Sequence, residues 1–270
     1  MKKIAIILVL GLGLLSFKKK EKTWVAIGDS ITYLNDHQSE TGDRLTRGYM
    51  TLVSEQLPHI KYINQGHNGW TAKGIAEQIE KLNIERADIY TIFLGTNDWW
   101  RGLPIGTIDD YSKGPISYFG SMGLIIEKVR VLNPKAKIVL ISPMQRGDFV
   151  YVNKYTNNAY GSYRAKNEQN LEDFANAVLE IGEKQHLKVV DLFHDSGINL
   201  ENMVNFKRLK NPNTGEYQNY KYPDYVDIPF NPNTDEYPYP PDAISMTYDG
   251  LHPSGLGNMV IAKMLVKTLK

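Results

Sequence analysis

The segment Trp24-Val25-Ala26-Ile27-Gly28-Asp29-Ser30-Ile31-Thr32 decides the fold. Its apolar first half has the character of a buried strand, and Gly-Asp-Ser follows where such a strand should break into a loop. A serine exposed at the carboxyl end of a leading strand is placed to act as a nucleophile. Because the same triplet also occurs in ordinary turns, its meaning depends on the rest of the chain.

From residue 23 onward, short apolar runs alternate with longer amphipathic stretches. This alternation is typical of a parallel sheet covered by helices on both faces. Strands are predicted at residues 24–27, 61–64, 89–94, 137–141 and 188–192. Helices are predicted at residues 48–57, 71–82, 116–132, 163–185 and 254–269.

One catalytic domain, residues 23–270, is the predicted organisation, because an α/β domain of this length can bury a large continuous core. An insertion rich in Tyr, Pro and Asn interrupts it at about residues 199–247. Its turn-forming clusters and tyrosines favour a structured excursion that rejoins the domain. The alternative, a disordered linker between two domains, is disfavoured because too little sequence follows it to form another domain.

The amino terminus has the profile of a signal peptide. Lys2 and Lys3 precede the apolar run 4–15, and further lysines follow at 18–20. We therefore interpret residues 1–22 as a leader and expect an exported protein, periplasmic, at the cell surface or secreted. The apolar run is shorter than the roughly 20 residues that a spanning helix needs, so no stable membrane span is expected after leader removal.

Charge and cysteine content restrict the function. With 31 basic and 30 acidic residues the formal charge is +1, which argues against a nucleic-acid partner because such a partner requires a concentrated basic face. The absence of cysteine excludes thiol nucleophiles and thiolate zinc sites. No histidine cluster has metal-ligand spacing, so we expect no metal and no cofactor. A small ester or a polysaccharide ester is the expected partner.

Loops at the carboxyl ends of parallel strands lie together, and this is where such folds bind their ligands. Ser30 follows the first predicted strand, Gly69 the second and Asn97 the third. The segment Asp249-Gly250-Leu251-His252-Pro253 comes just before the last predicted helix. Folding that helix back onto the sheet would bring Asp249 and His252 to the same edge.

These residues supply complementary parts of a hydrolase site. A serine hydroxyl needs a neighbouring base, a task that suits His252, and Asp249 can hold the other ring nitrogen of that histidine. Attack on an ester carbonyl creates an oxyanion, which requires donors already aimed at it. The candidates are the backbone N–H groups of Ser30 and Gly69 and the side-chain amide of Asn97.

The blocks Gly28-Asp29-Ser30, Gly69, Gly95-Thr96-Asn97-Asp98 and Asp249-Gly250-Leu251-His252-Pro253 resemble those of the SGNH, or GDSL, hydrolases in the family's order. The resemblance spans roughly residues 23–270. It implies a three-layer α/β/α sandwich around a mostly parallel five-stranded sheet, the flavodoxin-like form of an SGNH hydrolase. It also implies the triad and oxyanion roles just given. Ile31 occupies the position of the leucine in the name GDSL, and this difference affects no catalytic atom.

Neighbouring residues allow more than one interpretation. Asp29 is expected to be structural, and His67 is expected to satisfy local hydrogen bonds rather than act as a second base. Aromatic and basic residues near the motifs could stack on sugar rings or line an acyl cleft, although one tryptophan could equally pack beneath the loop. These candidate substrate-binding residues are Trp99, Trp100, Arg101, Tyr151 and Tyr155, with Tyr160 nearby.

The sequence favours an exported serine esterase that removes O-acetyl or other small acyl groups from carbohydrate. A lysophospholipase, thioesterase or arylesterase acting on longer or aromatic acyl esters is the alternative within enzymes. A catalytically silent carbohydrate-binding module is the alternative outside them, and it is disfavoured because no catalytic position is substituted. A metal phosphoesterase lacks a suitable histidine cluster.

Overall fold

The computed structural model describes residues 19–270 and centres on a five-stranded sheet. The strand order is β2-β1-β3-β4-β7, the flavodoxin-like order, and every neighbouring pair runs parallel. The strands are β1 Lys22–Gly28, β2 Ile60–Gly66, β3 Ile89–Phe93, β4 Lys137–Ile141 and β7 Lys188–Val190. The predicted leader, residues 1–22, lies outside the described residues except for its last four positions.

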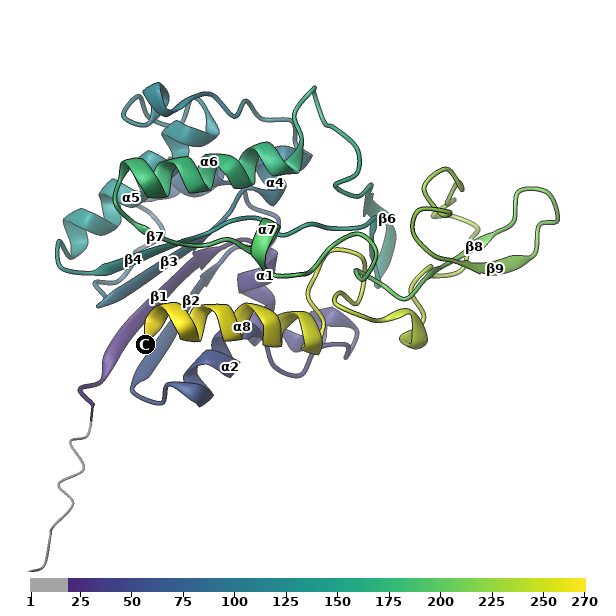
Figure 1. Cartoon of the computed structure of the whole chain (residues 1–270), viewed down its shortest axis with the longest axis horizontal. Helices are drawn as coiled ribbons and strands as arrows, with labels where there is room; N and C mark the ends of the chain where they lie inside the picture. The colour runs from purple at the N-terminus through teal and green to yellow at the C-terminus, as the bar shows by residue number, and fades with distance from the viewer. Residues whose placement is uncertain (1–18) are drawn as a thin grey trace, which may run out of the picture.

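Helices cover both faces of the sheet, which gives the predicted α/β/α sandwich (Figure 1). On one face lie α3 Ala72–Gln78, α5 Tyr118–Leu132 and α6 Leu171–Lys184. On the other lie α2 Tyr49–Gln56 and α8 Gly255–Leu269. Three short helices, α1 Ser30–Tyr33, α4 Thr96–Trp100 and α7 Leu192–Asp195, follow strands directly.

The central position of strand β1 explains why its sequence is a continuous apolar run. Val25 and Ile27 pack into the core beneath α3, α5 and α6, whereas Trp24 and Ala26 pack into the core beneath α2 and α8. A central parallel strand is buried on both faces, so the usual alternation with polar residues disappears. The indole Nε1 of Trp24 donates to Thr91 Oγ1 on β3 at 2.9 Å, which satisfies its polar atom inside the core.

Some predicted boundaries were wrong, and backbone geometry gives the reason. The helix predicted at 163–185 begins only at Leu171, because Asn167 and Glu168 have φ values of 48° and 62°. Asn170 then forms a capping box with Asp173 and starts the helix. The helix predicted at 71–82 already ends at Gln78. The last strand of the sheet ends at Val190, since Asp191 caps α7.

Two antiparallel hairpins extend one end of the sandwich (Figure 1). One is formed by β5 Phe149–Tyr151 and β6 Lys154–Ala159, and the other by β8 Lys207–Lys210 and β9 Tyr217–Tyr220 within the predicted insertion. The insertion packs on the first hairpin: Tyr237 Oη donates to Val150 O at 2.9 Å. The buried Lys207 ammonium also pairs with Asp148 at 2.7 Å.

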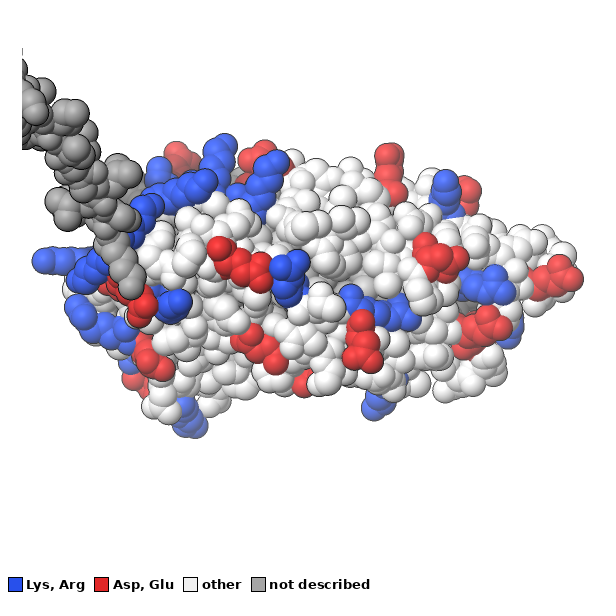
Figure 2. Space-filling model, turned by 90° about the horizontal axis from the view of Figure 1, so that it is seen from below, with Lys and Arg blue, Asp and Glu red and all other residues white. Residues whose placement is uncertain are grey.

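The described surface carries mixed charge. Figure 2 shows acidic and basic side chains interspersed over one face, with lysines and arginines gathered toward the end from which the chain enters β1. Between residues 19 and 270, no helix has both the length and the apolar character needed to cross a bilayer.

Candidate active site

Ser30 is the first residue of α1, immediately after β1. The side chain of Asp29 caps this helix by accepting from Ile31 N at 3.0 Å. Gly28 is required by packing, because a Cβ there would lie 2.0 Å from Thr32 Oγ1. The turn therefore has one geometry, which presents the Ser30 hydroxyl at the carboxyl end of the sheet.

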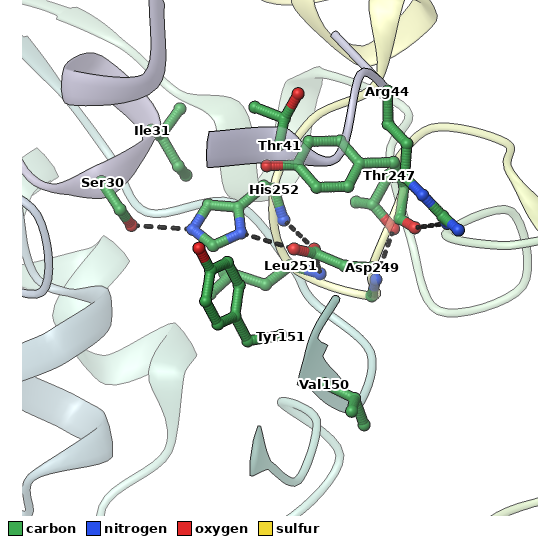
Figure 3. A network of polar contacts seen from close by, with 12 residues as sticks. Ser30, Ile31, Thr41, Arg44, Val150, Tyr151, Thr247, Asp249, Leu251 and His252 are labelled. Atoms are coloured by element: carbon green, nitrogen blue, oxygen red, sulfur yellow. Dashed lines mark hydrogen bonds and ion pairs between the residues drawn. The ribbon is translucent and has the colours of Figure 1, made fainter. Parts of the chain in front are cut away.

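The structure brings Ser30, His252 and Asp249 together (Figure 3). His252 Nε2 lies 2.9 Å from Ser30 Oγ, and Nδ1 lies 2.7 Å from Asp249 Oδ2. The carboxylate only accepts hydrogen bonds, so Nδ1 carries the proton and Nε2 is left to accept from the serine hydroxyl. All three side chains are buried, with Ser30 and His252 only 6% and 7% exposed.

Local and distant contacts fix the loop that carries the base. Asp249 Oδ1 accepts from His252 N at 2.7 Å and from Leu251 N at 3.0 Å, which orients the carboxylate. Gly250 has a φ of +88°, and Gly147 N donates to its carbonyl at 2.7 Å. The Phe149 ring packs edge-on against His252 with centroids 5.3 Å apart. Hairpin β5–β6 thus supports the imidazole, a contact that no sequence motif indicates.

The three proposed oxyanion donors belong to loops after β1, β2 and β3. Asn97, in α4, donates from Nδ2 to Trp70 O at 2.9 Å. The same nitrogen makes only a long, weak contact of 3.5 Å with Asp29 Oδ2, so its second N–H can turn to an oxyanion. Gly69 has a φ of +74°, where a side chain would be strained. Within residues 19–270, neither Ser30 N nor Gly69 N donates to another protein group. Such free, preoriented N–H groups can bind an oxyanion.

Comparison with known proteins agrees with this geometry. The model of the GDSL-like lipase/acylhydrolase family matches residues 26–260. The chain belongs to this family. It is accordingly a carboxylic ester hydrolase. No curated protein matches the chain.

Solved structures similar to this GDSL-like hydrolase cover nearly its whole length. A possible lipase from Chitinophaga pinensis has 60% identity and a TM-score of 0.91, over 92% of this chain and 98% of that one. An acetyl-xylooligosaccharide esterase from Geobacillus has 19% identity and a TM-score of 0.53, over 92% and 94%. A lipase/acylhydrolase from Enterococcus faecalis has 19% identity and a TM-score of 0.51, over 92% and 95%. The last two likenesses show the fold alone.

Two buried carboxyl groups support the loops of this GDSL-like hydrolase. Burial raises the pKa of Asp29 to about 6, and it raises that of Asp98 to about 6 as well. Asp98 accepts from Ala72 N at 2.8 Å at the start of α3, and so ties the loop after β3 to the loop after β2. Asp29 contacts backbone at the nucleophile turn, in agreement with its expected structural role. The link made by Asp98 was not predicted.

The candidate substrate-binding residues differ in position. Trp99 is fully buried and donates from Nε1 to Gln169 O at 3.1 Å, so it is the tryptophan that packs beneath the loop, one of the two interpretations left open by the sequence. Trp100 is half-buried against Tyr160, with ring centroids 4.7 Å apart. The exposed Arg101 donates to Gly69 O at 2.7 Å.

The two hairpin tyrosines and His67 also have different surroundings. Tyr151 lies beside the His252 ring (Figure 3) and packs with Phe149. Tyr155 packs on Tyr237 of the insertion, with ring centroids 5.3 Å apart. His67 packs against Trp70, and burial lowers its pKa. Its Nε2 is buried without a hydrogen-bond partner among the described residues, so the local hydrogen bonds expected for this ring were wrong at that atom. Residues 19–270 contain no group of three or more side chains suited to hold a metal ion.

Proposed function

We propose that this hydrolase is an exported esterase that removes O-acetyl or other small acyl groups from carbohydrate. The observation that carries the catalytic part is the hydrogen-bonded chain from Ser30 Oγ through His252 to Asp249, at 2.9 and 2.7 Å. Export is supported by the lysines and the apolar run 4–15 at the amino terminus.

The proposed reaction proceeds in two halves. Ser30 Oγ attacks the ester carbonyl while His252 Nε2 takes its proton, and the resulting oxyanion accepts hydrogen bonds from the N–H donors. His252 then protonates the departing sugar oxygen, which leaves an acyl group on Ser30. Water attacks this acyl group with His252 again as base, releasing the carboxylic acid and the free serine. Asp249 stabilises the imidazolium in both halves.

The surroundings of Ser30 favour a small acyl group. A long chain needs apolar surface to cover it, since each buried methylene contributes about 0.8 kcal/mol. Among residues 19–270, the large apolar side chains with high exposure are Ile116, Val131, Leu256 and Met259. None of them lies in residues 29–36, 67–71 or 95–101, which surround Ser30, Gly69 and Asn97 and whose exposed side chains are polar. The fold shared with the Geobacillus esterase is compatible with this assignment.

A lipase is the second candidate, because the relative with 60% identity is described as a possible lipase. The two candidates differ in how rate depends on acyl length. We expect p-nitrophenyl acetate to be hydrolysed with a higher kcat/KM than p-nitrophenyl octanoate, and acetate to be released from acetylated xylan. Ser30→Ala provides the control for background hydrolysis. A strong preference for octanoate with no acetate released from polysaccharide would overturn the carbohydrate assignment.

A further inference from the structure

We propose that a hollow beside the oxyanion loop is a subsite for a neutral sugar ring next to the acylated one. This inference rests on the proposed function, because it assigns part of the carbohydrate substrate to a place on the enzyme. The hollow has a volume of about 440 Å³ and is lined by Trp70, Thr71, Gly74, Glu77, Gln78 and Arg101. Such a volume falls within the range of small-ligand sites, roughly 300–1,000 Å³.

Helix α4 connects the hollow to the oxyanion donors. Asn97 and Arg101 lie one helical turn apart, with Arg101 N donating to Asn97 O at 2.9 Å. Asn97 binds Trp70 O at 2.9 Å, and Arg101 binds Gly69 O at 2.7 Å. The same short loop therefore supplies an oxyanion donor from Gly69 and a wall of the hollow from Trp70. The hollow therefore begins on the loop that carries an oxyanion donor and extends from there along α3.

The lining has the chemistry that sugar recognition requires. Trp70 is half-buried, and the His67 ring packs against its indole at 4.7 Å with an interplanar angle of 31°. A held aromatic ring offers a flat apolar surface to the C–H face of a sugar. The Gln78 amide can both donate and accept, and Arg101 has further N–H groups beyond the one used by Gly69. Glu77, paired with Lys73, adds an acceptor for hydroxyl groups.

Gly74 keeps this hollow open. It lies inside α3, where glycine is unfavourable compared with alanine. A Cβ at this position would lie 3.7 Å from Trp70 Cε3 and 3.3 Å from Thr71 Oγ1. The site can therefore accept a methyl group with a small adjustment, and φ does not demand glycine. A longer side chain at residue 74 would extend along the indole and fill the space.

The test compares a small substrate with an oligosaccharide. We expect Gly74→Leu and Gln78→Ala each to raise KM for acetylated xylo-oligosaccharides about tenfold, the scale of one lost binding contact. Their kcat/KM for p-nitrophenyl acetate should stay within about twofold, because this ester does not reach the hollow. Gly74→Ala is the matched control and should resemble the wild type with both substrates. Unchanged KM for the oligosaccharide in Gly74→Leu would overturn the subsite.

Direct binding separates this inference from the proposed function. Ser30→Ala protein, which cannot turn over, is titrated with unacetylated xylotetraose by calorimetry, with and without the additional Gly74→Leu change. The expected result is binding that weakens about tenfold in the double variant. If xylotetraose does not bind, or binds both proteins equally, the subsite is refuted. If it binds as expected while no acetate is released from oligosaccharide by the wild type, the subsite stands and the proposed reaction fails.

Discussion

Replacing Asn97 by alanine tests the oxyanion site most directly. The change removes the second amide N–H, which makes only a long contact of 3.5 Å with Asp29 Oδ2 while Nδ2 binds Trp70 O at 2.9 Å. Loss of one such donor typically raises the barrier by about 2.7 to 4 kcal/mol, which lowers kcat by roughly 10² to 10³. KM should change little, because the missing interaction is made chiefly in the transition state.

The same substitution also has a structural cost that can be separated from its catalytic cost. Trp70 O loses its partner, which should lower the free energy of unfolding by about 1 kcal/mol and the melting temperature by about 2 to 4 °C. Asn133 is a matched control, since its Nδ2 donates to Ala87 O at 2.8 Å in a buried position at the end of α5. Asn133 Oδ1 also accepts from Lys135 N at 3.2 Å, so we expect Asn133→Ala to lose at least as much stability, with kcat unchanged.

The assay is initial-rate hydrolysis of p-nitrophenyl acetate, with kcat and KM determined separately and thermal unfolding followed by circular dichroism. A folded Asn97→Ala enzyme with normal kcat would remove this residue from the oxyanion site. An equal loss of kcat in Asn133→Ala would show that the effect is one of stability. Either result would refute the reasoning from free N–H groups.

Three further expectations concern the nucleophile, a buried carboxyl and a strained turn. Ser30→Ala should lower p-nitrophenyl acetate hydrolysis by roughly 10⁴ to 10⁶ with little change in melting temperature, and retained activity would reject Ser30 as the nucleophile. Burial raises the pKa of Asp98 from 3.8 to about 6, so the folded protein keeps a proton that the unfolded chain releases, and stability falls as pH rises between these values. Asp98→Asn should remove about 2.4 kcal/mol of the fall between pH 4 and pH 7, measured by urea unfolding at these two pH values, and an identical pH dependence in both proteins would contradict this. Gly250→Ala places a Cβ 1.8 Å from Asp148 O at a φ of +88°, so we expect a loss of more than about 2 kcal/mol by urea unfolding, and wild-type stability would show that the turn can adjust.

Much of the fold follows from local patterns in the sequence. The central strands were predicted in the right places because apolar runs such as Val25 to Ile27 must be buried on both faces of a parallel sheet. The outer strands β2 and β7 were also predicted, but with different ends. The start of α6 was not predictable from periodicity, since the left-handed backbone of Asn167 and Glu168 interrupts the expected helix. The short helices α1 and α4 were missed because four or five residues carry too little periodicity to recognise.

The candidate site also contains residues that the sequence predicts and others that only the structure reveals. Ser30, Asn97 and His252 could be proposed from motif chemistry and from the rule that the carboxyl ends of parallel strands meet. The sequence predicted that one tryptophan could pack beneath the loop but not which one, because Trp99 and Trp100 have the same side chain and only packing distinguishes them. The hollow beside Trp70 also gives no signal in the sequence, since its lining comes from a loop, a helix face and the end of α4.

The sequence by itself determined the chemical groups available and the order of strands and helices, because side-chain type and hydrophobic periodicity are local properties. Tertiary structure alone decided that His252 Nε2 lies 2.9 Å from Ser30 Oγ across 222 positions of the chain. It also decided that Phe149 supports the imidazole and that Arg101 binds Gly69 O. Such distances depend on how distant segments pack around a shared core, and no local pattern specifies that packing.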